Sequence, residues 1–222
     1  MLGVPYDEQS SFARGSAKAP PLIRAAWRSG STNKYSEDLT LIDDSVLWDA
    51  GDLAFVPGDD PFALIEMEVG GLMDKGFSPI CLGGDHSITY PIVRAVARRH
   101  RHLNILHFDA HPDLYEEYEG NRLSHACPFA RIMEEGHVDR LVQIGVRSAT
   151  PHQKEQAERH GVELVEMRSW GGAVSFEFEG PVYVSFDVDG LDPAFAPGVS
   201  HRQPGGLSTR QAIDVIQSFK GR

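Results

Sequence analysis

Three short stretches of the sequence place histidine and aspartate side chains at a spacing that suits metal ions. They read GGDHS at 83–87, FDAHPD at 108–113 and SFDVDG at 185–190. Their candidate ligands are His86, Asp109, His111, Asp113, Asp187 and Asp189. Neighbouring carboxylates repel one another, and a bound cation removes that repulsion. The three stretches therefore predict a metal site.

The number of candidate ligands indicates two ions. Alternate residues of an extended chain point to the same side, so Asp109 converges with His111, and Asp187 with Asp189. If two aspartates bridge, each ion receives about four protein ligands, as in two-metal hydrolytic sites. Oxygen-rich ligands with two imidazoles and no thiolate favour Mn²⁺, with Mg²⁺, Co²⁺, Ni²⁺ and Zn²⁺ as alternatives.

Each stretch follows an apolar run that is typical of a buried strand. The expected strands are 78–84, 103–110, 140–146 and 181–190, because each is bounded by Gly, Pro or charge. The expected helices are 62–75, 89–100, 125–135, 151–160 and 212–219, the last with Ser208 as its N-cap. This alternation predicts one domain over residues 1–222, an α/β fold with three αβα layers and a mostly parallel central sheet. Ligands of such folds bind at the carboxyl ends of the strands, where the three stretches lie.

The overall composition excludes several classes of protein. The formal net charge of -11 argues against nucleic-acid and anionic-membrane partners, which favour basic surfaces. No run of about eighteen apolar residues is present, and the first residues do not resemble a secretion signal. Cys81 and Cys127 are expected to be reduced thiols. We therefore expect a cytoplasmic protein.

The three stretches, in this order, resemble the signatures of the ureohydrolase family, which contains arginases and agmatinases. The likeness extends to GVPYD at 3–7, GNRLSHACPFARIMEEG at 120–136 and PGVSHRQPGGLS at 197–208. It is strongest for plant-type arginases and the bacterial agmatinase-like proteins near them. The resemblance implies an arginase/deacetylase-like fold and a dinuclear metallohydrolase that acts on linear amidine C–N bonds. Such an enzyme uses a metal-bridging hydroxide and releases urea and a primary amine.

The resemblance also assigns the metal ligands. It implies two Mn²⁺ ions per chain, bridged by Asp109 and Asp187. One ion would be held by His86, Asp109, Asp113 and Asp187. The other would be held by Asp109, His111, Asp187 and Asp189.

The catalytic residues that the resemblance implies are His125, Asp113 and Asp189, which would move protons. His125 matches the position of the family's pocket histidine. The remaining histidines have no comparable neighbours, and we expect them at the surface or in packing. They are His100, His102, His107, His137, His152, His160 and His201.

Two departures from the family pattern affect the substrate. Residues 148–150 read Ser-Ala-Thr where animal-type arginases present an acid to the α-amino group, and Gln203 stands where many relatives have Glu. We expect agmatine, with L-arginine as the alternative and guanidinobutyrate and guanidine left open, in polyamine biosynthesis or arginine metabolism.

The resemblance further implies a homotrimer or hexamer. It also predicts an incomplete sheet, because the family's last strand, which lies inside the sheet and ends in a substrate-binding Glu, has no counterpart in the sequence. A truncated, catalytically impaired metal-binding relative is therefore a second alternative.

Three other classes of protein fit part of the pattern. A dinuclear phosphoesterase would need Lys or Arg near the metals, and the site segments offer only Arg202. A histone-deacetylase-like amidohydrolase uses one zinc and would not need Asp113, Asp187 and Asp189 together. A metal-stabilised structural or regulatory protein is the non-enzymatic alternative. Urea release with two manganese ions per chain separates a ureohydrolase from all three.

Overall fold

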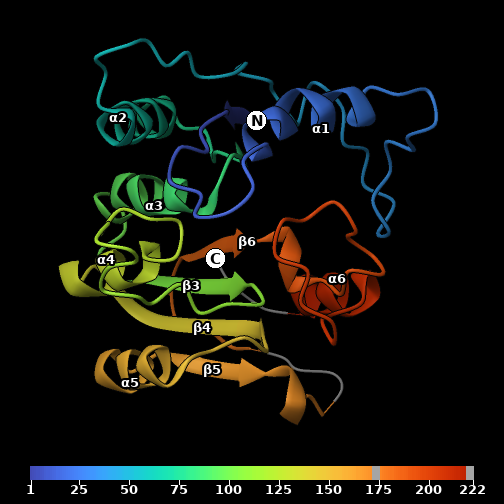
Figure 1. Cartoon of the computed structure of the whole chain (residues 1–222). Helices are drawn as coiled ribbons and strands as arrows, with labels where there is room; N and C mark the ends of the chain where they lie inside the picture. The colour runs from blue at the N-terminus through green and yellow to red at the C-terminus, as the bar shows by residue number, and fades with distance from the viewer. Residues whose placement is uncertain (172–175, 219–222) are drawn as a thin grey trace.

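The strands form two sheets, and within each sheet neighbouring strands run parallel. The computed structural model describes residues 1–171 and 176–218. In the smaller sheet, β1 (Leu2–Val4) pairs with β2 (Cys81–Gly83). The larger sheet contains, in spatial order, β5 (Glu163–Glu166), β4 (Val138–Val146), β3 (Leu103–Phe108) and β6 (Val182–Phe186). In Figure 1 the arrowheads of these four strands point to the same end, which confirms the predicted parallel α/β architecture.

The sheet is interrupted between β2 and β6. Within the described ranges, β2 pairs only with β1, and β6 pairs only with β3. The two edges nevertheless share one apolar cluster, because Cys81 of β2 and Tyr183 of β6 both pack against it. The interruption agrees with the expectation of an incomplete central sheet.

Helices cover both faces of the larger sheet, which gives the three predicted layers. The covering helices are α3 (Thr89–Ala97), α4 (Pro128–Glu135), α5 (Pro151–His160) and α6 (Thr209–Ser218), whereas α1 (Ala19–Trp27) and α2 (Pro61–Asp74) lie beside the smaller sheet. Successive strand residues point to opposite faces. Leu106 and Phe108 accordingly pack with α6, whereas Leu103 and Ile105 pack with α3, α4 and α5. Figure 1 shows α3, α4 and α5 on the other side of the strands from α6.

Several predicted boundaries differ from the observed ones. The strands predicted at 78–84 and 181–190 are shorter in the structure, because glycine and aspartate turns follow them. The helix predicted to begin at His125 begins at Pro128, since proline suits the first turn, and His125 lies in the preceding turn. The helix predicted to end at residue 100 ends at Ala97.

The last predicted helix is observed with its predicted cap. Helix α6 begins at Thr209, and the Ser208 hydroxyl accepts a hydrogen bond from the Gln211 backbone N–H at 3.2 Å. Phe219, the last residue of the predicted helix, lies outside the described residues. Helix α1 and strand β5 were not predicted.

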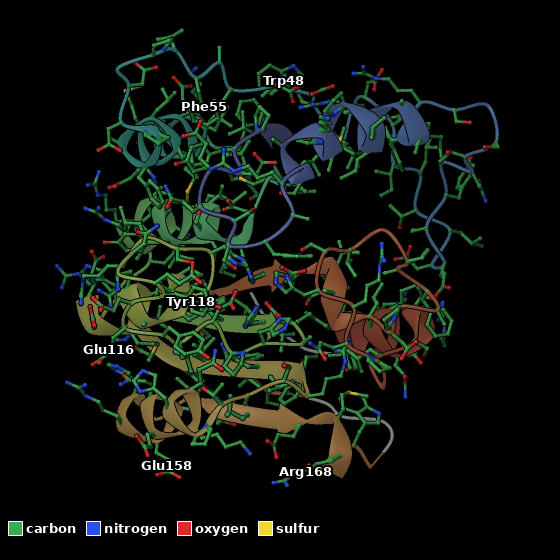
Figure 2. All side chains as sticks on the ribbon, viewed as in Figure 1. Trp48, Phe55, Glu116, Tyr118, Glu158 and Arg168 are labelled. Carbon is green, nitrogen blue, oxygen red and sulfur yellow. The ribbon has the colours of Figure 1, made fainter. Side chains whose placement is uncertain are left out.

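The later part of the long segment between α1 and α2 lies at the end of the molecule opposite α5, whereas its Glu37 contacts Arg210 of α6. Figure 2 shows Trp48 and Phe55 there, with Glu158 and Arg168 at the opposite end. Trp48 stacks on Phe77 at a centroid distance of 5.1 Å. None of the helices in the described part of the chain has the length and apolar character needed to cross a membrane.

Two glycines allow backbone segments to approach the residue that ends β3. A Cβ atom on Gly145 of β4 would lie 2.9 Å from the Asp109 carbonyl oxygen, and one on Gly190 would lie 2.9 Å from the Asp109 nitrogen. Gly145 also has a φ of +92°, which residues with side chains rarely adopt. Asp109 is therefore held between backbone segments that have no room for a side chain.

We predict that Gly145→Ala destabilises the protein much more than Gly161→Ala. Both glycines have positive φ, which costs a substituted residue about 1–2 kcal/mol. A Cβ on Gly161 would meet no atom within 4 Å, whereas one on Gly145 would meet the Asp109 backbone. Overpacking brings the expected loss at Gly145 to at least about 3 kcal/mol. Urea unfolding measures both free energies, and equal losses would contradict this account.

Candidate metal centre

The three acidic stretches come together because each follows a strand that ends at the same edge. His86 begins a short 3-10 helix (His86–Ile88) after β2, and Asp109 directly follows β3. Asp187 follows β6 and caps a second 3-10 helix (Val188–Gly190), where its Oδ1 accepts the Asp189 backbone N–H at 2.9 Å. These tight turns point the side chains towards one another.

His86 lies at the centre of a first group of carboxylates. Its Nδ1 atom is 3.0 Å from Asp109 Oδ2, 2.9 Å from Asp113 Oδ2 and 3.5 Å from Asp187 Oδ2. Its Nε2 atom lies 3.0 Å from the Ser185 hydroxyl. The buried Nδ1 makes no hydrogen bond of acceptable geometry within the described part of the chain. Three carboxylates thus surround a nitrogen that has no partner of its own.

His111 lies at the centre of a second group. Its Nδ1 atom is 3.2 Å from Asp109 Oδ1 and 3.3 Å from Asp189 Oδ2. Asp109 therefore belongs to both groups, with one carboxylate oxygen directed at each. The prediction that Asp187 also bridges the two groups has less support, because its contact is with His86, in the first group.

Burial and crowding perturb the acids and bases of both groups. Burial and the charges of Asp189 and Asp109 raise the pKa of Asp187 well above its usual value. Burial and the charge of Asp109 raise the pKa of Asp189 to about 6. Burial alone would lower the pKa of His111, but its hydrogen bonds to Asp109 and Asp189 raise that pKa to about 11. Without a cation, the cluster reduces its repulsion by holding protons.

The donor set of the cluster fits divalent cations. In each of two sets of side chains the possible ligand atoms lie within 4.8 Å of one another: buried His86, His107 and Asp109, and Asp109 and Asp189 with half-buried His111. Unpaired buried carboxylates are costly, and metal coordination offsets that cost. The free His86 Nδ1 and the shared Asp109 are the two observations of this structure that fit metal coordination best.

His125 lies at the rim of the cluster. Its Nε2 atom is 2.8 Å from the hydroxyl of Ser11 in the N-terminal segment. The His125 ring stacks on that of His201 at 5.6 Å, and the His201 ring contacts that of His111 edge-on, also at 5.6 Å. From the sequence we expected no such neighbours for His201, but in the structure His201 contacts both His125 and His111.

His107 is a second histidine that the sequence interpretation misplaced. It is fully buried in β3, and its Nε2 atom lies 3.0 Å from Asp109 Oδ2. Its Nδ1 atom lies 3.0 Å from the side-chain nitrogen of Gln143, which is also fully buried. Each of the two residues is a polar position inside an apolar strand, which signals a need for a hydrogen-bond partner but does not identify that partner.

Arg147 holds the loops behind the cluster together. Its Nη2 atom donates to the backbone oxygens of Asp189 at 2.7 Å and Gln203 at 2.6 Å. Arg202 donates through Nε to the Pro197 carbonyl at 3.0 Å. Both guanidinium groups thus bind backbone oxygens, which argues against a phosphate-binding role.

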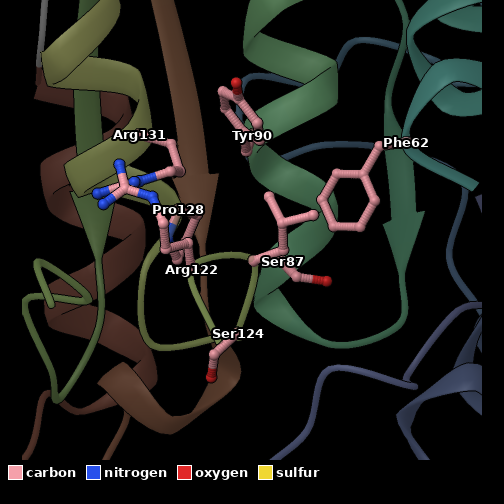
Figure 3. A pocket seen from close by; sticks show the side chains of 8 residues that line it. Phe62, Ser87, Tyr90, Arg122, Ser124, Pro128 and Arg131 are labelled. Atoms are coloured by element: carbon pink, nitrogen blue, oxygen red, sulfur yellow. The ribbon is translucent and has the colours of Figure 1, made fainter. Parts of the chain in front are cut away.

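A small hollow lies beside the cluster, where α2, α3 and α4 approach one another (Figure 3). Its lining includes Phe62, Ser87, Tyr90, Arg122, Pro128 and Arg131. The six predicted ligands are not among the residues that line it. His125 and His201 do not line it either, so the hollow is not part of the candidate site.

The expected cytoplasmic location is overturned by comparison with known proteins. The chain is 45% identical over 238 residues to a rice (Oryza sativa subsp. indica) protein named arginase 1, mitochondrial. The match covers 100% of this chain and 70% of the rice protein. An arginase of Medicago truncatula, 46% identical, is likewise named mitochondrial.

Other comparisons agree on the family. A chicken (Gallus gallus) mitochondrial agmatinase is 36% identical, with 100% of this chain and 69% of that protein covered. The solved structure of the arginase from Medicago truncatula superposes with a TM-score of 0.90 at 44% identity, over 99% of this chain and 76% of that one. The sequence model of the Arginase family matches residues 1–222. Together with the cluster of His and Asp side chains at one sheet edge, these matches show that the chain belongs to the arginase family of hydrolases.

Proposed function

We propose that the protein hydrolyses the C–N bond of a guanidino compound to urea and a primary amine at a centre of two Mn²⁺ ions. The observation that carries this proposal is the sharing of Asp109. Its Oδ2 and Oδ1 atoms face separate groups around His86 and His111. One carboxylate between two sets of ligands suits a pair of ions a few ångströms apart.

The ligand types support manganese. Asp109, Asp113 and Asp187 would hold one ion with His86, and Asp189 would complete the second set around His111. Oxygen-rich sites with imidazole and no thiolate suit Mn²⁺. When bound, two such ions supply Lewis acidity, which lowers the pKa of water and stabilises developing negative charge.

The histidine at the rim would supply the proton that the leaving group requires. A departing amine must gain a proton as the C–N bond breaks, and an imidazole can deliver one near neutral pH. His125 has its Nε2 within 2.8 Å of Ser11, which orients the ring. Asp113 lies 2.9 Å from His86 Nδ1 and Asp189 lies 3.3 Å from His111 Nδ1, and these two acids would relay protons within the cluster.

The likeness to proteins named arginases favours L-arginine over agmatine as the substrate. The expectation of agmatine depended on the absence of an acid at residues 148–150. In the structure, Thr150 is the N-cap of α5, with its hydroxyl accepting from the Gln153 backbone N–H at 3.3 Å. The loop is thus held by helix capping, and its lack of an acid argues only against an animal-type arginine pocket.

The protein loaded with Mn²⁺ should release urea from L-arginine faster than from agmatine. Colorimetric urea assays with each substrate, together with elemental analysis of manganese, test the proposal. Two ions per chain with urea release support it. Faster release from agmatine would reverse the substrate assignment and leave the hydrolase intact. Two bound ions without urea from either substrate, or from guanidinobutyrate or guanidine, would indicate a non-enzymatic metal-binding protein.

Asp109→Asn should remove both ions, whereas Asp189→Asn should retain one. The amide keeps the shape of the carboxylate but cannot supply negative charge, and Asp109 is the one acid among the described residues that contacts both imidazole ligands. Manganese per chain after dialysis measures the difference. The control is Asp139→Asn, which alters a surface Asp–His pair with a 2.7 Å contact to His102. Retention of one tightly held ion by Asp109→Asn would contradict the shared role.

His125→Ala should lower kcat by about 100-fold or more without changing the manganese content, because general acid catalysis typically contributes a factor of that size. Ser11→Ala should have a smaller effect, since the imidazole is retained. His137→Ala, at an exposed position, serves as the control. Unchanged kcat in the His125 variant would refute a proton-transfer role for this residue.

A further inference from the structure

A row of polar side chains crosses the larger sheet just below the metal centre. The register pairs His107 of β3 with Gln143 of β4 on one side and with Ser185 of β6 on the other. All three residues are buried. His107 lies two residues before Asp109, so both point to the same face of the sheet. The row therefore lies directly beneath the carboxylate that the two groups share.

The direction of each hydrogen bond in this row follows from one carbonyl group. The side-chain nitrogen of Gln143 lies 2.7 Å from the Pro112 backbone oxygen, which can only accept. This contact identifies the nitrogen end of the amide, and the same nitrogen lies 3.0 Å from His107 Nδ1. Nδ1 is therefore the acceptor, and in neutral imidazole the proton resides on Nε2. The Nε2–H group then donates to Asp109 Oδ2 at 3.0 Å.

The same geometry argues against His107 as a metal ligand. His86, His107 and Asp109 have ligand atoms within 4.8 Å of one another, so proximity alone would admit His107 to the first group. A ligating imidazole needs a free lone pair directed at the ion. In His107, Nδ1 already accepts from Gln143, and Nε2 carries the proton directed at Asp109. Neither nitrogen has a lone pair to offer.

We propose that His107, oriented by Gln143, is a positioning residue that fixes the rotation of the Asp109 carboxylate. With Oδ2 held by His107 and Oδ1 by the His111 backbone N–H at 2.6 Å, each oxygen faces one group of ligands. A carboxylate oxygen has lone pairs enough to accept this hydrogen bond and still bind an ion. The proposal rests on the manganese centre proposed above and adds two residues outside its ligand set.

The test compares the manganese affinity of three variants by titration calorimetry. His107→Leu removes the donor, and the expected loss is about 10–100-fold for both ions, with two ions still bound. His107→Gln should restore much of the affinity, because its amide nitrogen can reach the position of Nε2. Gln143→Met removes the donor to Nδ1 and should cause a smaller loss. Gln156→Leu, which alters a buried glutamine of α5, is the matched control.

A second measurement needs no metal. Nitrogen-15 spectra of the metal-free protein should show His107 protonated at Nε2 alone, and Gln143→Met should allow the other tautomer. Circular dichroism and thermal unfolding identify any variant that does not fold. If Gln143→Met does not fold, the nitrogen-15 spectra of the wild-type protein still decide the tautomer of His107.

The outcomes separate this inference from the proposed function. Wild-type protein that binds no Mn²⁺ would overturn the centre and the positioning role with it. Wild-type protein that binds two ions no more tightly than His107→Leu would overturn the positioning role alone. Loss of one complete ion in His107→Leu, or a proton on Nδ1, would make His107 a ligand instead.

Discussion

The electrostatic repulsion among four neighbouring aspartates is the constraint on which the rest of the site depends. Asp109 and Asp189 are buried, and burial together with the neighbouring carboxylates raises the pKa of both Asp187 and Asp189. In the described ranges no Lys or Arg forms an ion pair with these aspartates, and Arg147 donates to backbone oxygens behind the cluster. Crowded aspartates are costly without a metal, and this same crowding supplies the negative charge that binds divalent cations.

The fold brings these charges together with little freedom. Parallel strands end at one edge, so β2, β3 and β6 deliver their acidic turns to the same place. Gly145 and Gly190 let backbone segments approach Asp109 to distances that a Cβ atom would not permit. Such packing confines the Asp109 main chain, and the hydrogen bonds to its two oxygens confine its carboxylate. Preorganisation of this kind limits the rearrangement that ion binding would need.

The sequence predicted the parts of the fold whose residues carry a strong local signal. Strand β3 begins at its predicted residue and ends two residues earlier than predicted, and helix α5 matches its prediction, because β3 is a mostly apolar run and α5 has a Thr150 cap and a Gly161 stop. Strand β5, Glu163–Glu166, was missed because it is short, lies at an edge and begins and ends with charge. Helix α1 was missed because its two prolines resemble a loop, although proline is well tolerated in a first helical turn.

The candidate ligands could be named from spacing alone, but the residues that support them could not. Asp109 and His111 share one short motif, whereas the contact between His107 and Gln143 depends on the register of two strands. Register is set by packing across the whole sheet, so no local pattern identifies the pair. A fully buried His or Gln within an apolar strand still needs a hydrogen-bond partner. Where such a residue lies two positions before a carboxylate at a strand end, that carboxylate is the first partner to consider.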